Sequence, residues 1–150
     1  MIFKYCRDYI RTLNASITPS SLPSNTRITI IGCGDPGLIS SYVQSTNCAF
    51  PLYVDPTREL YRAFNLARTL NPGEKPEYMK SMLNVLVTGV VDGIKAGSKA
   101  LKGGDWSQVG GEFMFVRKGS DWEVEWCHRA KTTRDHTGMQ QMKNLLGVKA

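Results

Sequence analysis

The sequence predicts one α/β domain in which helices cover a sheet. Two short strand patterns, the first of them β-branched, alternate with helical patterns, a β-hairpin follows near the carboxyl end, and a last helix closes the chain. The predicted order is helix, strand, helix, strand, two helices, two strands and a helix, which is typical of an α/β sheet with a mixed edge. The 150 residues suit a single domain, 1–150, that buries roughly 68–70% of the surface of its unfolded chain.

The first predicted helix is Lys4–Leu13, because apolar residues recur there at helical spacing. Its apolar positions are Phe3, Tyr5, Cys6, Tyr9, Ile10 and Leu13. The stretch Asn14–Thr26 is expected to be a loop, since Ser, Thr, Pro and Asn dominate it. The β-branched run Arg27–Gly32 (RITIIG) then predicts a buried strand.

Asp35 is expected to cap a second helix that has Pro36 at its first position and runs to about Ser45. The run Phe50–Val54 predicts another short strand, entered through a proline. A third helix should follow from Thr57. Its inward residues are expected to be Leu60, Tyr61 and Phe64.

A break is predicted at Asn71–Pro76 (NPGEKP). The longest helical pattern follows, in which apolar residues repeat at spacings of three and four from Met79 to Ile94. This pattern predicts an amphipathic helix packed on the sheet rather than a membrane helix, because its apolar run is too short to span a bilayer. The segment Gly97–Asp105 is expected to be a basic, glycine-rich loop.

Two runs near the carboxyl end, Gly111–Val116 (GEFMFV) and Trp122–Cys127 (WEVEWC), predict a buried β-hairpin around the turn Arg117–Asp121. Four consecutive apolar residues in the first run indicate burial on both faces. Alternation in the second run should separate Trp122, Val124 and Trp126 on one face from Glu123, Glu125 and Cys127 on the other. After a polar link, Arg129–His136, a last helix is predicted at Thr137–Leu146, ended by Gly147.

Composition argues against several classes of function. The net charge of +6 comes from scattered Lys and Arg, and no basic stripe with interleaved aromatic residues indicates a nucleic-acid partner. The amino terminus has no signal-peptide pattern and no membrane partner is expected, so the predicted location is cytoplasmic. The four cysteines lie at wide, irregular spacing that fits neither a disulfide framework nor a zinc site. We therefore expect free thiols, no metal and no cofactor.

Four segments together carry a family resemblance that covers essentially the whole chain. They are IGCGDP (31–36), NCAFPLYVDPTRELYRAF (47–64), GGDWSQVGGEFMF (103–115) and WCHRAKTTRDH (126–136). With them the chain resembles the AhpC/TSA-type peroxiredoxin-like proteins. That resemblance implies a thioredoxin-like three-layer fold, with a central sheet flanked by helices, and an antioxidant redox thiol. It also implies a small peroxide or related peroxy substrate and a thiol electron donor such as thioredoxin or glutathione.

The redox site of such families is a C-x-x-C pair at the amino end of the first core helix, where the helix terminus favours a thiolate. Cys6 matches the second cysteine of that pair, whereas the first position falls on Phe3. The first core strand, which should precede the pair, is missing, and Val109-Gly110-Gly111 stands where the family has a cis-proline. Unpaired backbone groups in a core are costly, so the gap needs an explanation. Truncation at the amino end is favoured over a rearrangement or a homodimer that fills the gap.

Cys6 is therefore the first candidate for a catalytic thiol, with Arg7 and Tyr9 as neighbours, although a buried structural role on the helix is equally open. Cys33 is a weaker candidate, because it lies between two glycines at a strand end, where ligands approach α/β sheets. Cys48 lies in a loop before a strand and is interpreted as incidental.

The carboxyl-terminal segment offers further candidates. His128 could activate Cys127, but the acidic face predicted for this cysteine disfavours a thiolate. A metal site formed by Cys127, His128, Asp135 and His136 matches no established spacing. Hydrogen bonding among Arg129, Arg134 and Asp135, tying the last helix to the hairpin, is the favoured interpretation.

Two functions from different classes follow from these residues. The first is a peroxiredoxin-like thiol oxidoreductase that reduces a peroxide through Cys6. The second is a non-catalytic or degenerate thioredoxin-fold binding module, which Phe3 in place of the first cysteine favours for this chain. A general thiol–disulfide role without peroxide is a third.

Overall fold

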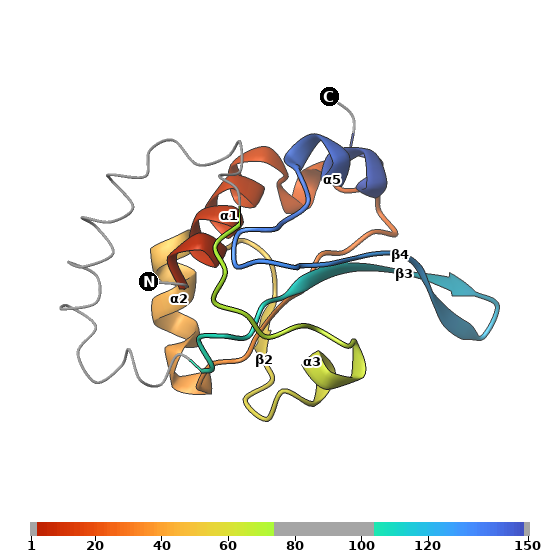
Figure 1. The fold of residues 1–150 in the computed structure, drawn as a ribbon. Coiled ribbons are helices and arrows are strands. Elements are labelled where there is room, and N and C mark those ends of the chain that lie inside the picture. The colour runs from red at the N-terminus through yellow and green to blue at the C-terminus, as the bar shows by residue number, and fades with distance from the viewer. Residues whose placement is uncertain (1–2, 74–103, 149–150) are drawn as a thin grey trace.

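A computed structural model describes residues 3–73 and 104–148 of the chain (Figure 1). The helices are α1 (Phe3–Ser16), α2 (Ile39–Thr46), α3 (Glu59–Ala63) and α5 (Met139–Leu146), and 3₁₀ turns occupy Pro19–Ser21 and Pro36–Leu38. The strands are β1 (Ile30–Gly32), β2 (Leu52–Val54), β3 (Gly111–Lys118) and β4 (Asp121–Arg129). The helix predicted over Met79–Ile94, and most of the predicted loop before Asp105, lie outside the described residues. Within those residues, no helix combines the length and the apolar character needed to cross a membrane.

Helix α1 carries the centre of the hydrophobic core. Its buried residues pack together with Cys48 and Phe50, and α5 and the start of β1 cover them. The buried residues that α1 and the residue after it contribute are Tyr9, Ile10, Leu13 and Ile17. The predicted helix is confirmed, and it continues to Ser16, beyond the predicted end. The polar residues near this end stay helical because the Asn14 side chain donates to the Ile10 carbonyl, one turn back, at 3.0 Å.

The first two strands form a short parallel pair in which Ile30 lies opposite Leu52. The predicted strands were too long, because ladder pairing holds only three residues of each. The burial predicted for the first strand is also wrong in part, since Ile31 is 41% exposed. Among the described strands, β1 pairs with β2 alone, so no described strand lies along its other edge.

Helix α2 begins as the sequence predicts but not with the predicted geometry. The Asp35 carboxylate accepts a hydrogen bond from the Gly37 amide at 2.7 Å, which confirms the cap. Pro36 opens a 3₁₀ turn, and the α-helix itself starts at Ile39. Asn47, in the left-handed conformation at φ 54°, ends it.

Helix α3 is a single short helix that Asp55 holds in place. The Asp55 carboxylate accepts from the amides of Glu59 at 3.2 Å and Leu60 at 2.9 Å, so the helix starts two residues later than predicted. Phe64 points inward as expected and stacks on Phe113 at 4.5 Å. Leu60 was predicted to face inward but is 41% exposed.

A β-bulge between Met114 and Phe115 divides the predicted hairpin into two parts. From the turn to the bulge, Phe115 pairs with Val124; beyond it, Met114 pairs with Trp126. Paired residues share a face and neighbours along a strand do not, so the bulge turns Trp126 to the face opposite Val124. The predicted common face of Trp122, Val124 and Trp126 is therefore wrong, and Cys127 shares the face of Phe113 rather than that of Glu123.

The far end of the hairpin projects from the body of the molecule (Figure 1). Trp122 is 66% exposed there, so the prediction of a hairpin buried throughout is wrong. Helices cover only the end that starts at Gly111, because the described part of the chain supplies no element to pack on the rest.

The described strands form two separate pairs, β1–β2 and β3–β4, instead of the one central sheet expected. Residues of β1, β3, α1 and α2 line a cleft of about 1430 Å³. This cleft brings the amino end of α1 close to the start of the hairpin, which positions the candidate site.

Candidate functional site

The Glu112 carboxylate is the centre of a hydrogen-bonded cluster. Glu112 is the second residue of β3 and lies opposite His128 in the β-ladder, so the hairpin itself brings the two side chains together. Glu112 Oε2 lies 2.7 Å from His128 Nδ1, and Oε1 lies 3.1 Å from His136 Nδ1. The hydroxyl of Thr137 donates to Oε2 at 3.1 Å. The Glu112 carboxylate thus contacts both histidines, and its side chain is only 14% exposed.

His136 is held from two further sides. Its ring stacks on the Tyr9 ring of α1, with 4.3 Å between centroids and 12° between planes. The Tyr9 hydroxyl donates to the Thr137 carbonyl at 3.1 Å, which ties the segment before α5 to α1. Thr137 is buried and bonded in this way instead of starting the last helix, so α5 begins at Met139, two residues later than predicted. It ends before Gly147 as predicted.

The electrostatics of the cluster favour a charged imidazole. Burial of the His136 ring opposes a positive charge, but hydrogen bonds and negative charge at Cys6 and Glu112 outweigh it and raise the pKa of His136 to about 10. Burial likewise opposes the charge of Glu112, yet the two histidines hold its pKa below the ordinary value. At neutral pH the cluster therefore contains an imidazolium and a carboxylate.

A second carboxylate lies beyond His128. His128 Nε2 is 3.0 Å from Asp135 Oδ1, and Asp135 Oδ2 accepts from the Lys131 amide at 2.8 Å. The four side chains His136, Glu112, His128 and Asp135 form a continuous series of contacts, which we call the histidine–carboxylate chain. One end of this chain meets Cys6.

Cys6 lies in the first turn of α1, where the helix dipole favours negative charge. The thiol is partly exposed and lines the cleft, and it hydrogen bonds with His136. Of its predicted neighbours, Tyr9 belongs to the cluster through its stacking on His136. The Arg7 guanidinium lies 5.8 Å from the centroid of the Tyr42 ring. A cysteine in contact with an imidazole side chain is the pair of groups that thiol-dependent catalysis uses.

Cys33 lines the same cleft at the end of β1. Burial raises the pKa of its thiol, and negative charge at Cys6 adds to this effect, so Cys33 favours the protonated form. The backbone of Gly104 passes directly over it: a Cβ on this glycine would lie 3.0 Å from Cys33 Sγ. Cys33 is thus near the site but less suited to attack.

The other two cysteines lie apart from the histidine–carboxylate chain. Cys48 is buried in the core and donates to the Phe50 carbonyl at 3.5 Å. Cys127 shares a face with Phe113 and accepts from the Arg129 guanidinium at 3.1 Å, while His128 faces Glu112. This geometry does not support activation of Cys127 by His128, which the sequence analysis also disfavoured, because successive residues of a strand point to opposite faces. Within residues 3–73 and 104–148, no His, Cys, Asp and Glu side chains form a metal-binding group.

The sequence made Cys6 a candidate but did not predict the pairing of His136 with Glu112. Glu112 stood in an apolar strand pattern, GEFMFV, as its single charged residue. That position was a usable signal, because a charge on a half-buried strand requires a partner. The partner could not be named from the sequence, since the bulge sets the register.

Comparison with known proteins adds independent information. A profile of the family described as AhpC/TSA antioxidant enzyme matches residues 12–132. Human (Homo sapiens) peroxiredoxin-like 2C is 25% identical over 147 residues, covering 95% of this chain and 63% of the relative. The Bos taurus protein of the same name is also 25% identical, over 95% of this chain and 62% of its own length. The chain thus spans somewhat less than two thirds of the length of these relatives. No solved structure matches it.

Proposed function

We propose that this chain, which belongs to the AhpC/TSA antioxidant enzyme family, acts as a thiol oxidoreductase domain that reduces a peroxide or related peroxy substrate through Cys6. The observation that carries the proposal is the contact between Cys6 and a His136 whose pKa is raised to about 10. Family membership supports thiol redox chemistry in general, and the cluster supports Cys6 as the thiol that performs it.

The chemistry is a nucleophilic displacement at oxygen. The Cys6 thiolate attacks one peroxide oxygen, an S–O bond forms, and the O–O bond breaks. Cys6 becomes a sulfenic acid, and the departing alkoxide takes a proton to leave as an alcohol or as water. Two equivalents of an external thiol, such as glutathione or a thioredoxin dithiol, then return Cys6 to the thiol and release a disulfide and water.

Each member of the cluster has a separate task in this scheme. The His136 imidazolium stabilises the thiolate and supplies the proton that the alkoxide needs. Glu112 keeps the charge on His136 and fixes the orientation of its ring through Nδ1. Tyr9 packs against one face of the His136 ring by stacking. The partly buried setting strengthens all these interactions relative to bulk water.

Trapping of the sulfenic acid tests the proposal directly. The purified chain is treated with hydrogen peroxide and dimedone, and the labelled cysteine is identified by mass spectrometry. We expect labelling at Cys6, and peroxide consumption with a thioredoxin- or glutathione-regenerating system that is lost in Cys6→Ser. Cys127→Ser is the matched control, because this thiol lies on the other face of the hairpin beside Arg129. Cys33→Ser measures the weaker candidate, and we expect a smaller loss.

The binding-module alternative makes the opposite prediction. If Cys6 carries no dimedone adduct and all three variants consume peroxide as slowly as the wild type, the chain is a non-catalytic thioredoxin-fold module. Disulfide exchange that depends on Cys6, without any peroxide consumption, would instead indicate a general thiol–disulfide role.

A further inference from the structure

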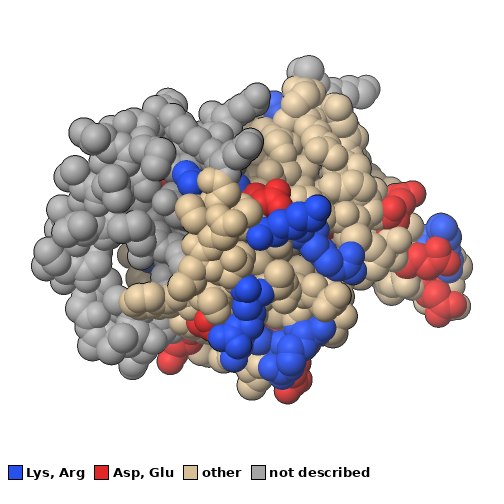
Figure 2. Space-filling view, in the orientation of Figure 1, with Lys and Arg blue, Asp and Glu red and all other residues tan. Residues whose placement is uncertain are grey.

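We propose that a pocket formed by three arginines, Arg58, Arg62 and Arg68, binds the carboxylate of a small molecule that reacts at the Cys6 site. The inference rests on the proposed function and deepens it by assigning a place for the charged end of a substrate or of a thiol donor. The pocket has a volume of about 130 Å³, and Leu66 and Gln108 complete its lining. Figure 2 shows Lys and Arg side chains gathered on the surface over the α3 region.

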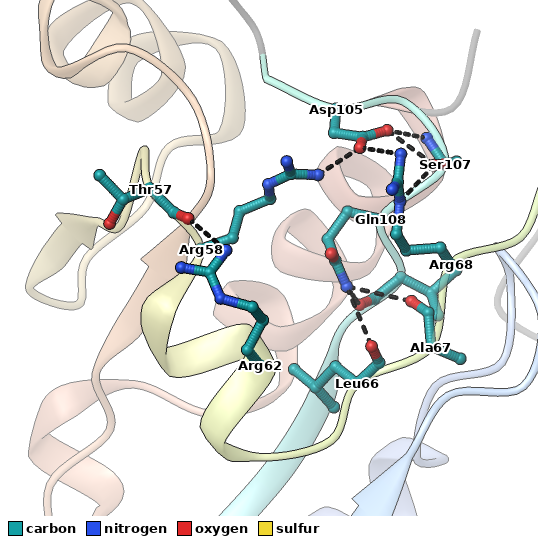
Figure 3. A network of polar contacts seen from close by, with 10 residues as sticks. Thr57, Arg58, Arg62, Leu66, Ala67, Arg68, Asp105, Ser107 and Gln108 are labelled. Atoms are coloured by element: carbon teal, nitrogen blue, oxygen red, sulfur yellow. Dashed lines mark hydrogen bonds and ion pairs between the residues drawn. The ribbon is translucent and has the colours of Figure 1, made fainter.

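The pocket keeps a net positive charge. Asp105 pairs with both Arg58 and Arg68 (Figure 3). Hydrogen bonds from Ser107, together with the two guanidinium groups, lower the pKa of Asp105 to about 2, so this carboxylate stays charged. One carboxylate thus faces three guanidinium groups, and the excess of positive charge is available to an anionic ligand.

Of the three arginines in the pocket, Arg62 is the one that forms no ion pair with a described residue. Its Nη1 donates to the Thr57 carbonyl at 2.9 Å, and none of the ion pairs within the described residues includes Arg62. Figure 3 shows this guanidinium on the wall opposite Arg68. A planar guanidinium with donors to spare is the side chain best suited to bidentate binding of a carboxylate.

The arrangement of Arg58 and Arg62 raises the free energy of the folded chain when no ligand is bound. The two residues are four positions apart, with the Arg62 amide bonded to the Arg58 carbonyl at 3.0 Å, and like charges at this spacing repel. Arg58 also adopts the left-handed conformation, at φ 61°, which non-glycine residues rarely do. Strain of this kind gathers at ligand sites, where binding compensates for it.

Hydrogen bonds hold the side chains of the opposite wall in the free chain. Arg68 and Gln108 form an isolated antiparallel bridge. Arg68 Nε donates to the Ser107 hydroxyl at 3.1 Å, and the Gln108 amide donates to the carbonyls of Ala67 and Val109, each at 3.0 Å. A wall fixed in this way loses little conformational entropy on binding, which favours affinity.

The size and position of the pocket indicate what part of a ligand it holds. A volume of about 130 Å³ corresponds to about four water molecules, enough for a carboxylate and its nearest atoms but not for a whole metabolite. Leu66 and Gln108 line both this pocket and the cleft that contains Cys6 and Cys33. A molecule anchored by its carboxylate can therefore extend into the redox cleft.

Two probes that cannot react with Cys6 distinguish a carboxylate on the thiol donor from one on the peroxy substrate. S-methylglutathione represents a peptide thiol donor, and octanoate represents a carboxylate-bearing hydroperoxide. The ester of each probe, which lacks the carboxylate charge, is the control ligand. Binding is measured by isothermal titration calorimetry on the wild type, Arg62→Gln and Arg62→Lys. Lys118→Gln is the matched control, because it removes one positive charge from the hairpin end, where Lys118 pairs with Glu123.

We expect at least one acid to bind with a Kd that rises about tenfold or more in Arg62→Gln, less in Arg62→Lys, and less than twofold in Lys118→Gln. Esterification should weaken binding by a similar factor in the wild type only. If only S-methylglutathione binds, the pocket serves the thiol donor; if only octanoate binds, it serves the substrate. If both bind, the pocket accepts the carboxylate of either molecule. The proposal is overturned if neither acid binds or if Arg62→Gln binds as the wild type does. Because binding should persist in Cys6→Ser, this result is independent of whether Cys6 is catalytic.

Discussion

Replacing His136 by glutamine should make the stability of the protein much less dependent on pH. The pKa of His136 is raised from its ordinary value of 6.5 to about 10 in the folded chain. A folded pKa above the unfolded one means that the charge contributes its full stability below pH 6.5 and loses it as the pH rises through about 10. One pKa unit corresponds to about 1.4 kcal/mol, so the contribution is at most about 4 kcal/mol at pH 7 and close to zero at pH 10.

Urea unfolding followed by tryptophan fluorescence, at pH 7 and at pH 10, measures this contribution. The variant also loses the stacking on Tyr9, but that loss is the same at both pH values, so the difference between them isolates the charge. We expect the destabilisation by His136→Gln to be larger at pH 7 than at pH 10 by about 3 kcal/mol. Gln140→Ala, an exposed change on α5, should show no such difference. Equal destabilisation by His136→Gln at both pH values would refute a charged His136.

Three further changes test neighbouring parts of the structure. Glu112→Gln removes the charge that holds the proton on His136. The alkylation of Cys6 by iodoacetamide at pH 7, measured by peptide mass mapping, should therefore slow about tenfold, which corresponds to about 1.4 kcal/mol in activation free energy. An unchanged rate would show that Glu112 is dispensable. Gly104→Ala places a Cβ 2.5 Å from the Cys33 carbonyl oxygen at a φ of 93°, so it should lower the free energy of unfolding in urea by about 2 kcal/mol. The added Cβ of Gly110→Ala meets no atom within 4 Å, so this control should lower the free energy of unfolding by less than half as much. Asp55→Ala removes the acceptor for the first amides of α3 and should lower the free energy of unfolding by about 1 kcal/mol; no change in the urea midpoint would contradict this.

The sequence predicted the kind and order of the described elements better than their lengths. Helical spacing located α1, and the Asp35 cap located the start of α2, because both signals are local. Strand lengths were overestimated because pairing decides them: β1 has β2 as its partner along only three residues. The single predicted sheet and the burial of the hairpin depended on which elements cover each surface, which a local pattern does not contain.

The candidate site shows the same limit at a single residue. Cys6 became a candidate through its position in the family resemblance, but Glu112 acquires its partner only through the hairpin register. Uninterrupted pairing from the turn would place Glu112 opposite Cys127, and the bulge moves it opposite His128. His136 lies in the segment between β4 and α5, and its position depends on contacts with Tyr9 of α1 and Glu112 of β3.

The composition of the site bears on how a chain with Phe3 at the first C-x-x-C position could react at Cys6. In a two-cysteine site the neighbouring thiol resolves the oxidised cysteine, and the register that the resemblance implies has Phe3 in place of that thiol. In the proposed function activation needs no second thiol, because His136, held by the Glu112 carboxylate, would take that role. Resolution would then fall to an external thiol, which must reach Cys6 through the cleft. The proposed cationic pocket beside that cleft is where a thiol donor or a substrate with a carboxylate would gain affinity, and the binding of the two probes decides between them.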